Sequence, residues 1–143
     1  MTTPDDPLPT APSCPAQVTM PAGAGHAATG SHGEQLAVEH VSSLGMEVLA
    51  RNWRISQGDL RGELDIVALD HLNGIVVFVE VKTRRGEGFG GPLGAIDGRK
   101  RAQLRRLAMA FMGQARLPYR EVRFDVVGVR LDTRHLHHVV DAL

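Results

Sequence analysis

The five residues at positions 75–79 constrain the fold most, because every one of them is apolar. A strand with one solvated face alternates apolar and polar residues, whereas an unbroken apolar run indicates a strand covered on both faces. Glu80 and Lys82 follow directly and, two residues apart on a strand, point the same way. Charged groups at the end of a buried strand are costly, so they require a partner or a function.

A second acid, Asp65, lies on the preceding predicted strand, residues 63–69, and residues 70–74 between the two strands are typical of a turn. Directly paired residues of an antiparallel hairpin share a face, and their numbers sum to a constant. Asp65 and Glu80 share a face only if that constant is odd. A two- or four-residue loop gives this register, whereas a three-residue loop without a bulge separates the acids.

Carboxylates from two neighbouring strands can hold one hard cation. Mg²⁺ keeps several waters and takes one or two protein carboxylates together with substrate phosphate. We therefore predict Asp65 and Glu80 as ligands of Mg²⁺ or Mn²⁺, with Lys82 beside the attacking water and the scissile phosphate. The alternative is a buried ion pair of Glu80 with Lys82 that only stabilises the fold.

Length and composition predict one folded domain in a chain of 143 residues. Six of the eight prolines precede residue 22, so residues 1–28 are predicted to be a disordered Pro/Ala-rich tail and residues 29–143 the domain. The single cysteine, Cys14, fits a reducing cytoplasm and excludes disulfides and a cysteine-zinc site. No signal peptide or membrane span is recognisable, so a cytoplasmic protein without a membrane partner is expected.

Basic residues are concentrated after the predicted site, although the formal net charge is zero. A basic segment beside an acidic metal site suits a polyanion substrate, because phosphate contacts supply most sequence-independent affinity. A solvated helix face is the alternative. The residues predicted to contact nucleic acid are Arg84, Arg85, Lys100, Arg101 and Arg105.

The remaining pattern predicts a helix opened by a capping box of Ser31 and Glu34, then a strand over residues 46–51 and a polar connection over residues 55–59. The glycine-rich residues 86–94 predict a loop, either a flap over a nucleic-acid backbone or plain surface. Asp97 caps a second helix, and strands follow over residues 122–126 and 134–140. His135, His137 and His138 on the last strand lack a further ligand at a recognisable spacing. This order, αβββαββ, predicts an α/β sandwich with a mixed sheet of four or five strands and two helices.

Five motifs in this order are similar to the YraN-like bacterial proteins, a family largely uncharacterised in function that is placed in the restriction-endonuclease-like superfamily of PD-(D/E)XK nucleases. They are Gly-Glu at 33–34, Ala-Arg-Asn-Trp-Arg at 50–54, Gly-Glu-Leu-Asp-Ile-Val-Ala at 62–68, Val-Phe-Val-Glu-Val-Lys-Thr-Arg at 77–84 and Arg-Phe-Asp-Val-Val at 123–127. The superfamily includes archaeal Holliday-junction resolvases, and the resemblance implies its sandwich fold.

The resemblance also implies roles for matching residues. Asp65 corresponds to the metal-binding aspartate, and Glu80 and Lys82 correspond to the acid and lysine of the second motif. Glu34 corresponds to a helix glutamate that joins the metal site in resolvase-like members, which competes with its capping-box interpretation. Leu64 stands where the superfamily often has proline.

The predicted function is metal-dependent hydrolysis of phosphodiester bonds in DNA, with Mg²⁺ or Mn²⁺ as cofactor. Nothing in the sequence reads bases, so cleavage of branched or junction DNA in repair or recombination is favoured over sequence-specific cleavage. Symmetric cutting of a junction needs two active sites, which a homodimer would supply. The alternative is a non-catalytic nucleic-acid-binding protein of the nuclease fold.

Overall fold

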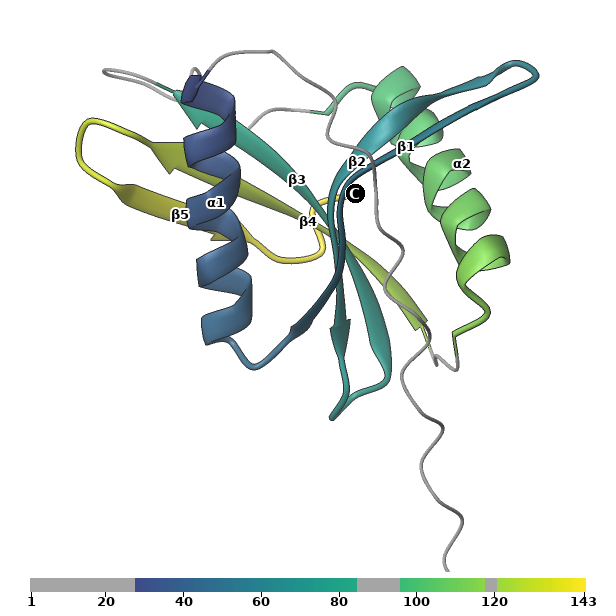
Figure 1. Cartoon of the computed structure of the whole chain (residues 1–143), viewed down its shortest axis with the longest axis horizontal. Coiled ribbons are helices and arrows are strands. Elements are labelled where there is room, and N and C mark those ends of the chain that lie inside the picture. Colours follow the sequence, from purple (N-terminus) through teal and green to yellow (C-terminus); the bar gives the residue numbers. More distant parts are fainter. Residues whose placement is uncertain (1–27, 85–95, 118–120) are drawn as a thin grey trace, which may run out of the picture.

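The computed structural model describes residues 28–84, 96–117 and 121–143 (Figure 1). Three sequence predictions lie outside these ranges: the tail up to residue 27, the glycine-rich loop, and Arg85. In the described part of the chain, no helix is long and apolar enough to cross a membrane.

Seven elements make up the described fold, and they confirm the predicted α/β class and the order αβββαββ. They are α1 (Ala28–Ser43), β1 (Glu47–Gln57), β2 (Leu60–Asp70), β3 (Ile75–Arg84), α2 (Gly98–Ala115), β4 (Glu121–Arg130) and β5 (His135–Val139). The strands form one mixed sheet in the order β1-β2-β3-β4-β5. Among the described strands, β3 and β4 are the one parallel pair, because α2 connects them as a crossover.

The central strand β3 is covered on both faces, as its apolar run predicts. Val76 and Phe78 belong to a hydrophobic cluster with α2, whereas Val77 and Val79 belong to a second cluster with α1. Figure 1 shows the two helices on opposite sides of the sheet. The sheet is therefore the middle layer of a sandwich, and its central strand carries the core of both layers.

The β2–β3 hairpin has the even loop that the register argument requires. Asp70 pairs with Ile75, so four residues, 71–74, form the turn. The Asp70 carboxylate accepts hydrogen bonds from the backbone N–H of Leu72 and Asn73, and Gly74 takes φ 67°. This side-chain-stabilised turn fixes the register in which Asp65 and Glu80 fall on the same face.

The first hairpin is longer than predicted. Both β1 and β2 continue through residues 55–63 and meet at a two-residue turn in which Gly58 has φ 59°, so the prediction of a polar connection over residues 55–59 was wrong. Helix α2 stabilises this polar ribbon: the Gln103 side chain donates to the Arg61 carbonyl, and Arg106 Nη2 lies 3.0 Å from Asp59 Oδ2. Contacts distant in sequence therefore override the weak local strand pattern.

Helix α1 begins at Ala28, so the predicted capping box at Ser31 and Glu34 was wrong. Its close approach to the sheet depends on Gly33, which is buried against β3. A Cβ atom at Gly33 would lie 2.1 Å from Thr83 Oγ1. This glycine therefore places the next residue, Glu34, near the end of β3 that carries the predicted site.

Helix α2 follows its prediction closely. The Asp97 carboxylate accepts a hydrogen bond from the Lys100 backbone N–H, which caps the helix. An apolar stripe along α2 is buried, and Trp53 of β1 packs edge-on against Phe111 with ring centroids 5.5 Å apart. Trp53 is thus a core residue. The buried residues of α2 are Leu104, Leu107, Ala108, Phe111 and Met112.

A buried ion cluster joins β4, β5 and α1. Asp125 is only 1% exposed and accepts two hydrogen bonds from Arg123, at 2.9 and 3.0 Å, and one from His138 Nε2 at 2.8 Å. The other ring nitrogen of His138 lies 3.0 Å from His40 Nε2 on α1. Asp141 N–H completes the set of donors to Asp125. A buried carboxylate with this many partners is fully compensated, which accounts structurally for His138.

Replacement of Gly33 by alanine should destabilise the fold, because the new methyl group collides with Thr83 on the packed face of α1. We expect the free energy of unfolding to fall by about 1–3 kcal/mol. Gly113→Ala is the matched control, because a Cβ atom there meets nothing within 4 Å and should stabilise α2 by about 0.5–1 kcal/mol. Urea denaturation of both variants measures the difference, and equal stability would contradict this packing role.

Candidate metal and nucleic-acid site

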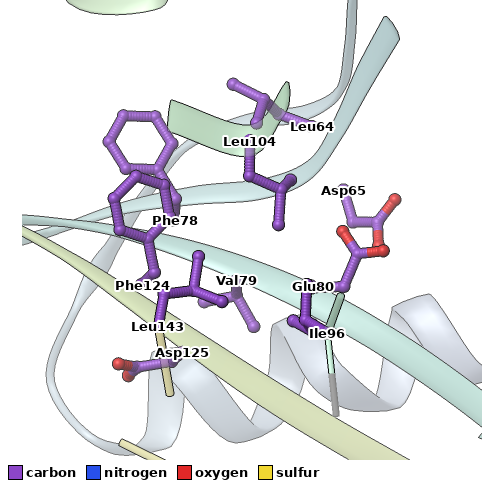
Figure 2. Close-up of a pocket in the computed structure, with 10 residues that line it drawn as sticks. All are labelled: Leu64, Asp65, Phe78, Val79, Glu80, Ile96, Leu104, Phe124, Asp125 and Leu143. Atoms are coloured by element: carbon purple, nitrogen blue, oxygen red, sulfur yellow. The ribbon is translucent and has the colours of Figure 1, made fainter. Parts of the chain in front are cut away.

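The candidate site lies where strands β2 and β3 separate. Their ladder ends at Ile66 and Val79, and the next residues in the same register are Asp65 and Glu80. The backbone N–H of Val81 donates to Asp65 Oδ2 at 2.8 Å. A side-chain carboxylate therefore takes a backbone donor of β3 at the point where the two strands part, and Figure 2 shows the Asp65 and Glu80 carboxyl groups side by side.

A small pocket adjoins this pair of acids. Asp65 and Glu80 lie together at one side of it, and the Asp125 carboxylate points away from them (Figure 2). Asp125 therefore belongs to the ion cluster beneath α1 and not to the candidate site. The remaining lining is mostly apolar: Leu64, Phe78, Val79, Ile96, Leu104, Phe124 and Leu143.

Each acid of the site is held by a different donor. Glu80 Oε1 lies 3.1 Å from Lys100 Nζ on the first turn of α2, and its side chain is 16% exposed. Glu34 on α1 accepts a 3.0 Å hydrogen bond from the side chain of Asn52. Arg54 makes a 2.8 Å ion pair with Glu63, which immediately precedes Leu64 and Asp65 on β2. Acidic side chains from β2, β3 and α1 therefore surround the site.

The surroundings of Asp65 disfavour its ionised form. Burial raises its pKa to about 7, and the negative charges of Glu80, Glu34 and Glu63 add to this effect. The hydrogen bond from Val81 acts in the opposite direction, because it stabilises the ionised carboxylate. No basic side chain is among the causes that offset the burial. A nearby cation would relieve both the desolvation and the repulsion.

The residues fit a divalent ion with few protein ligands. In the described ranges, no three His, Cys, Asp or Glu side chains are close enough to hold a metal ion as they stand. Mg²⁺ and Mn²⁺ accept one or two carboxylates plus waters, so Asp65 and Glu80 suffice. Glu34 is near enough to influence the pKa of Asp65, but its side chain is bound to Asn52.

The predicted basic residues occupy different positions around these acids. Lys82 is half-buried on β3, two residues beyond Glu80, and Arg84 is exposed where β3 ends. Lys100 contacts Glu80 directly, and Arg101 donates to the Ile96 carbonyl. Arg105 is exposed on α2, and Arg85 lies outside the described residues.

Two features of the site were not predicted from the sequence. One is the direct ion pair of Lys100 with Glu80, which depends on how α2 packs on the sheet. The other is Asn52, whose backbone has a positive φ of 49° and whose amide binds Glu34. A polar asparagine beside the buried Trp53 is the signal available in the sequence, since asparagine tolerates that backbone region.

Comparisons with known proteins agree with the resemblance. Residues 33–129 match the Uncharacterised protein family UPF0102. The chain belongs to this family. A UPF0102 protein of Mycolicibacterium smegmatis is 48% identical over 102 residues, which cover 71% of this chain and 79% of that protein. A UPF0102 protein of Nocardia farcinica is 45% identical over 116 residues, which cover 81% and 86%. The part of this chain that matches UPF0102 contains all the acids of the site.

Removing the charge of Asp65 should stabilise the metal-free protein at high pH. The pKa of Asp65 rises from 3.8 to about 7 on folding, so the folded state holds this proton more tightly. The stability that the protonated Asp65 contributes is therefore fully present below pH 4 and is lost as the pH rises through about 7. We expect Asp65→Asn to be more stable than wild type at pH 8 by on the order of 2 kcal/mol, and to differ less at pH 5.

Urea denaturation at both pH values in the presence of a chelator measures this difference. Asp59→Asn is the control for loss of an exposed carboxylate, because the Asp59 side chain is 88% exposed and its ion pair with Arg106 is a solvent-exposed one that contributes little. Its effect should be small at either pH. A stability loss in Asp65→Asn at pH 8 would contradict the charge repulsion described for this site.

Proposed function

We propose that this protein is a metal-dependent endonuclease that hydrolyses phosphodiester bonds in DNA. The observation that carries the proposal is the opposition of Asp65 and Glu80 on adjacent strands, with Asp65 partly buried and further negative charges around it. Such a pair is destabilising for a purely structural site, and a divalent ion would neutralise it. The basic N-terminal part of α2 lies beside it through Lys100.

Asp65 and Glu80 would hold Mg²⁺ or Mn²⁺, with Glu34 as the third acid nearby. When bound, the cation lowers the pKa of a water molecule and neutralises charge on the phosphate. Lys82 would orient the attacking water or stabilise negative charge that develops on the phosphate. The sequence has only two lysines: Lys100 contacts Glu80, and Lys82 follows Glu80 by two residues on β3. The ammonium group of lysine is a compact point charge, so it suits a site where one positive charge can take the place of another.

We infer the substrate from the basic charge, since no motif in the sequence is typical of base reading. Arg84, Arg85, Lys100, Arg101 and Arg105 would bind phosphates, which gives affinity without sequence preference. We therefore propose a cytoplasmic enzyme that recognises the shape of branched or junction DNA in repair or recombination. A homodimer would supply the two active sites that symmetric junction cutting requires.

A second candidate function is nucleic-acid binding without turnover. One observation favours it: the acids Glu34, Glu63 and Glu80 already have protein partners, which are Asn52, Arg54 and Lys100 respectively. A metal ion would have to compete with Lys100 for Glu80. A protein that only binds nucleic acid would leave these contacts in place.

Cleavage assays distinguish the two functions. Labelled branched, flapped, single-stranded and duplex DNA are incubated with Mg²⁺ or Mn²⁺ and with wild type, Asp65→Ala or Lys82→Ala at matched purity and salt. We expect metal-dependent cutting by wild type and a loss of at least about 100-fold in each variant, since each removes a charge at the reacting phosphate. Branched substrates should be cut fastest.

Glu39→Ala is the matched control, because Glu39 is an exposed acid of α1 whose side chain binds Gln35 and not the site. It should cut like wild type. Salt-sensitive binding by all proteins without cutting by any would favour the binding function. Cutting that survives in Asp65→Ala would contradict the proposed site.

A further inference from the structure

Asn52 occupies an unusual position in strand β1. The β1–β2 ladder keeps one register on both sides of it, which places Asn52 directly opposite Asp65 on β2. Its φ of 49° lies in the left-handed region, which is unfavourable for most residues and is found more often for asparagine. A strained backbone of this kind persists only where the surrounding structure holds it, and it is frequent at functional sites.

This backbone conformation changes where the side chains of β1 point. Successive side chains of a regular strand lie on opposite faces. Here two successive residues both reach α1: Arg51 Nη1 donates to Gln35 Oε1, and Asn52 Nδ2 donates to Glu34 Oε2, each at 3.0 Å. The next residue, Trp53, packs in the cluster on the α2 side. The left-handed residue therefore turns an amide donor toward the helix glutamate.

The hydrogen bond fixes the orientation of Glu34. A carboxylate only accepts hydrogen bonds, so the amide nitrogen of Asn52 must face it. The backbone of this part of α1 is already fixed by the contact between Gly33 and Thr83. The remaining freedom of Glu34 is that of its side chain, and the partly buried bond to Asn52 restricts it while its charge acts on Asp65.

We propose that Asn52 is a positioning residue of the carboxylate site: it holds Glu34 where the negative charge of Glu34 acts on Asp65 and strengthens the binding of a divalent ion by Asp65 and Glu80, without Glu34 itself being a ligand in this arrangement. This inference rests on the proposed function, because it assigns Asn52 to the same metal site. Outer-shell partners of this kind typically change metal affinity by about 10–100-fold.

The test measures Mn²⁺ affinity by electron paramagnetic resonance for wild type, Asn52→Gly, Glu34→Gln and the double variant, with urea denaturation of each. Glycine accepts φ 49° without strain, so Asn52→Gly removes the amide and keeps the backbone. We expect about 10-fold weaker Mn²⁺ binding in Asn52→Gly. Because Asn52 acts through Glu34, adding Asn52→Gly to Glu34→Gln should weaken binding by less than about twofold more.

Gln35→Ala is the matched control, since it breaks the neighbouring bond between the same strand and helix without touching an acid of the site. It should bind Mn²⁺ like wild type. If wild type binds and Asn52→Gly binds equally well, or if the two changes are additive, the role of Asn52 is overturned and the proposed function stands. If wild type binds no Mn²⁺, the metal site and the role of Asn52 both fail.

Discussion

The repulsion between two carboxylates, Asp65 and Glu80, is the interaction on which the account of this protein depends. Buried charges in proteins normally have partners, and Asp125 obeys this rule with Arg123, His138 and a backbone N–H around it. Asp65 is only partly buried, but its hydrogen bond comes from a backbone amide and the charged side chains that shift its pKa are acids. The sheet therefore contains a fully buried aspartate with charged partners and a partly buried one among other acids, and the second marks the candidate site.

Two glycines bring the helices close enough to form this site. Gly33 lets α1 lie against Thr83, and Gly62 lies where a Cβ atom would be 2.8 Å from Leu107 of α2. Each glycine directly precedes a glutamate near Asp65. The two glycines thus allow close packing directly beside two acids of the site. The stability of the sandwich and the geometry of the site therefore depend on the same positions.

Much of this arrangement could be predicted from the sequence, because it depends on local rules. The apolar run of β3 predicted cover on both faces, and the register argument showed that Asp65 and Glu80 share a face if the turn has two or four residues, which the four-residue turn fulfils. Features that depend on distant contacts were not predictable in this way. The extension of the β1–β2 hairpin depends on α2, and the ion pair of Lys100 with Glu80 depends on how that helix docks. The capping-box pattern at Glu34 was misleading, because the helix had already begun at Ala28.

The most direct test of the central claim is a crystal structure of the wild-type protein grown with Mn²⁺, using anomalous diffraction to locate the ion. We expect an anomalous peak between the Asp65 and Glu80 carboxylates, with oxygen ligands at about 2.0–2.2 Å, and Lys100 displaced from Glu80. A structure at saturating Mn²⁺ in which the acids keep their present partners and no peak lies between them would contradict the claim.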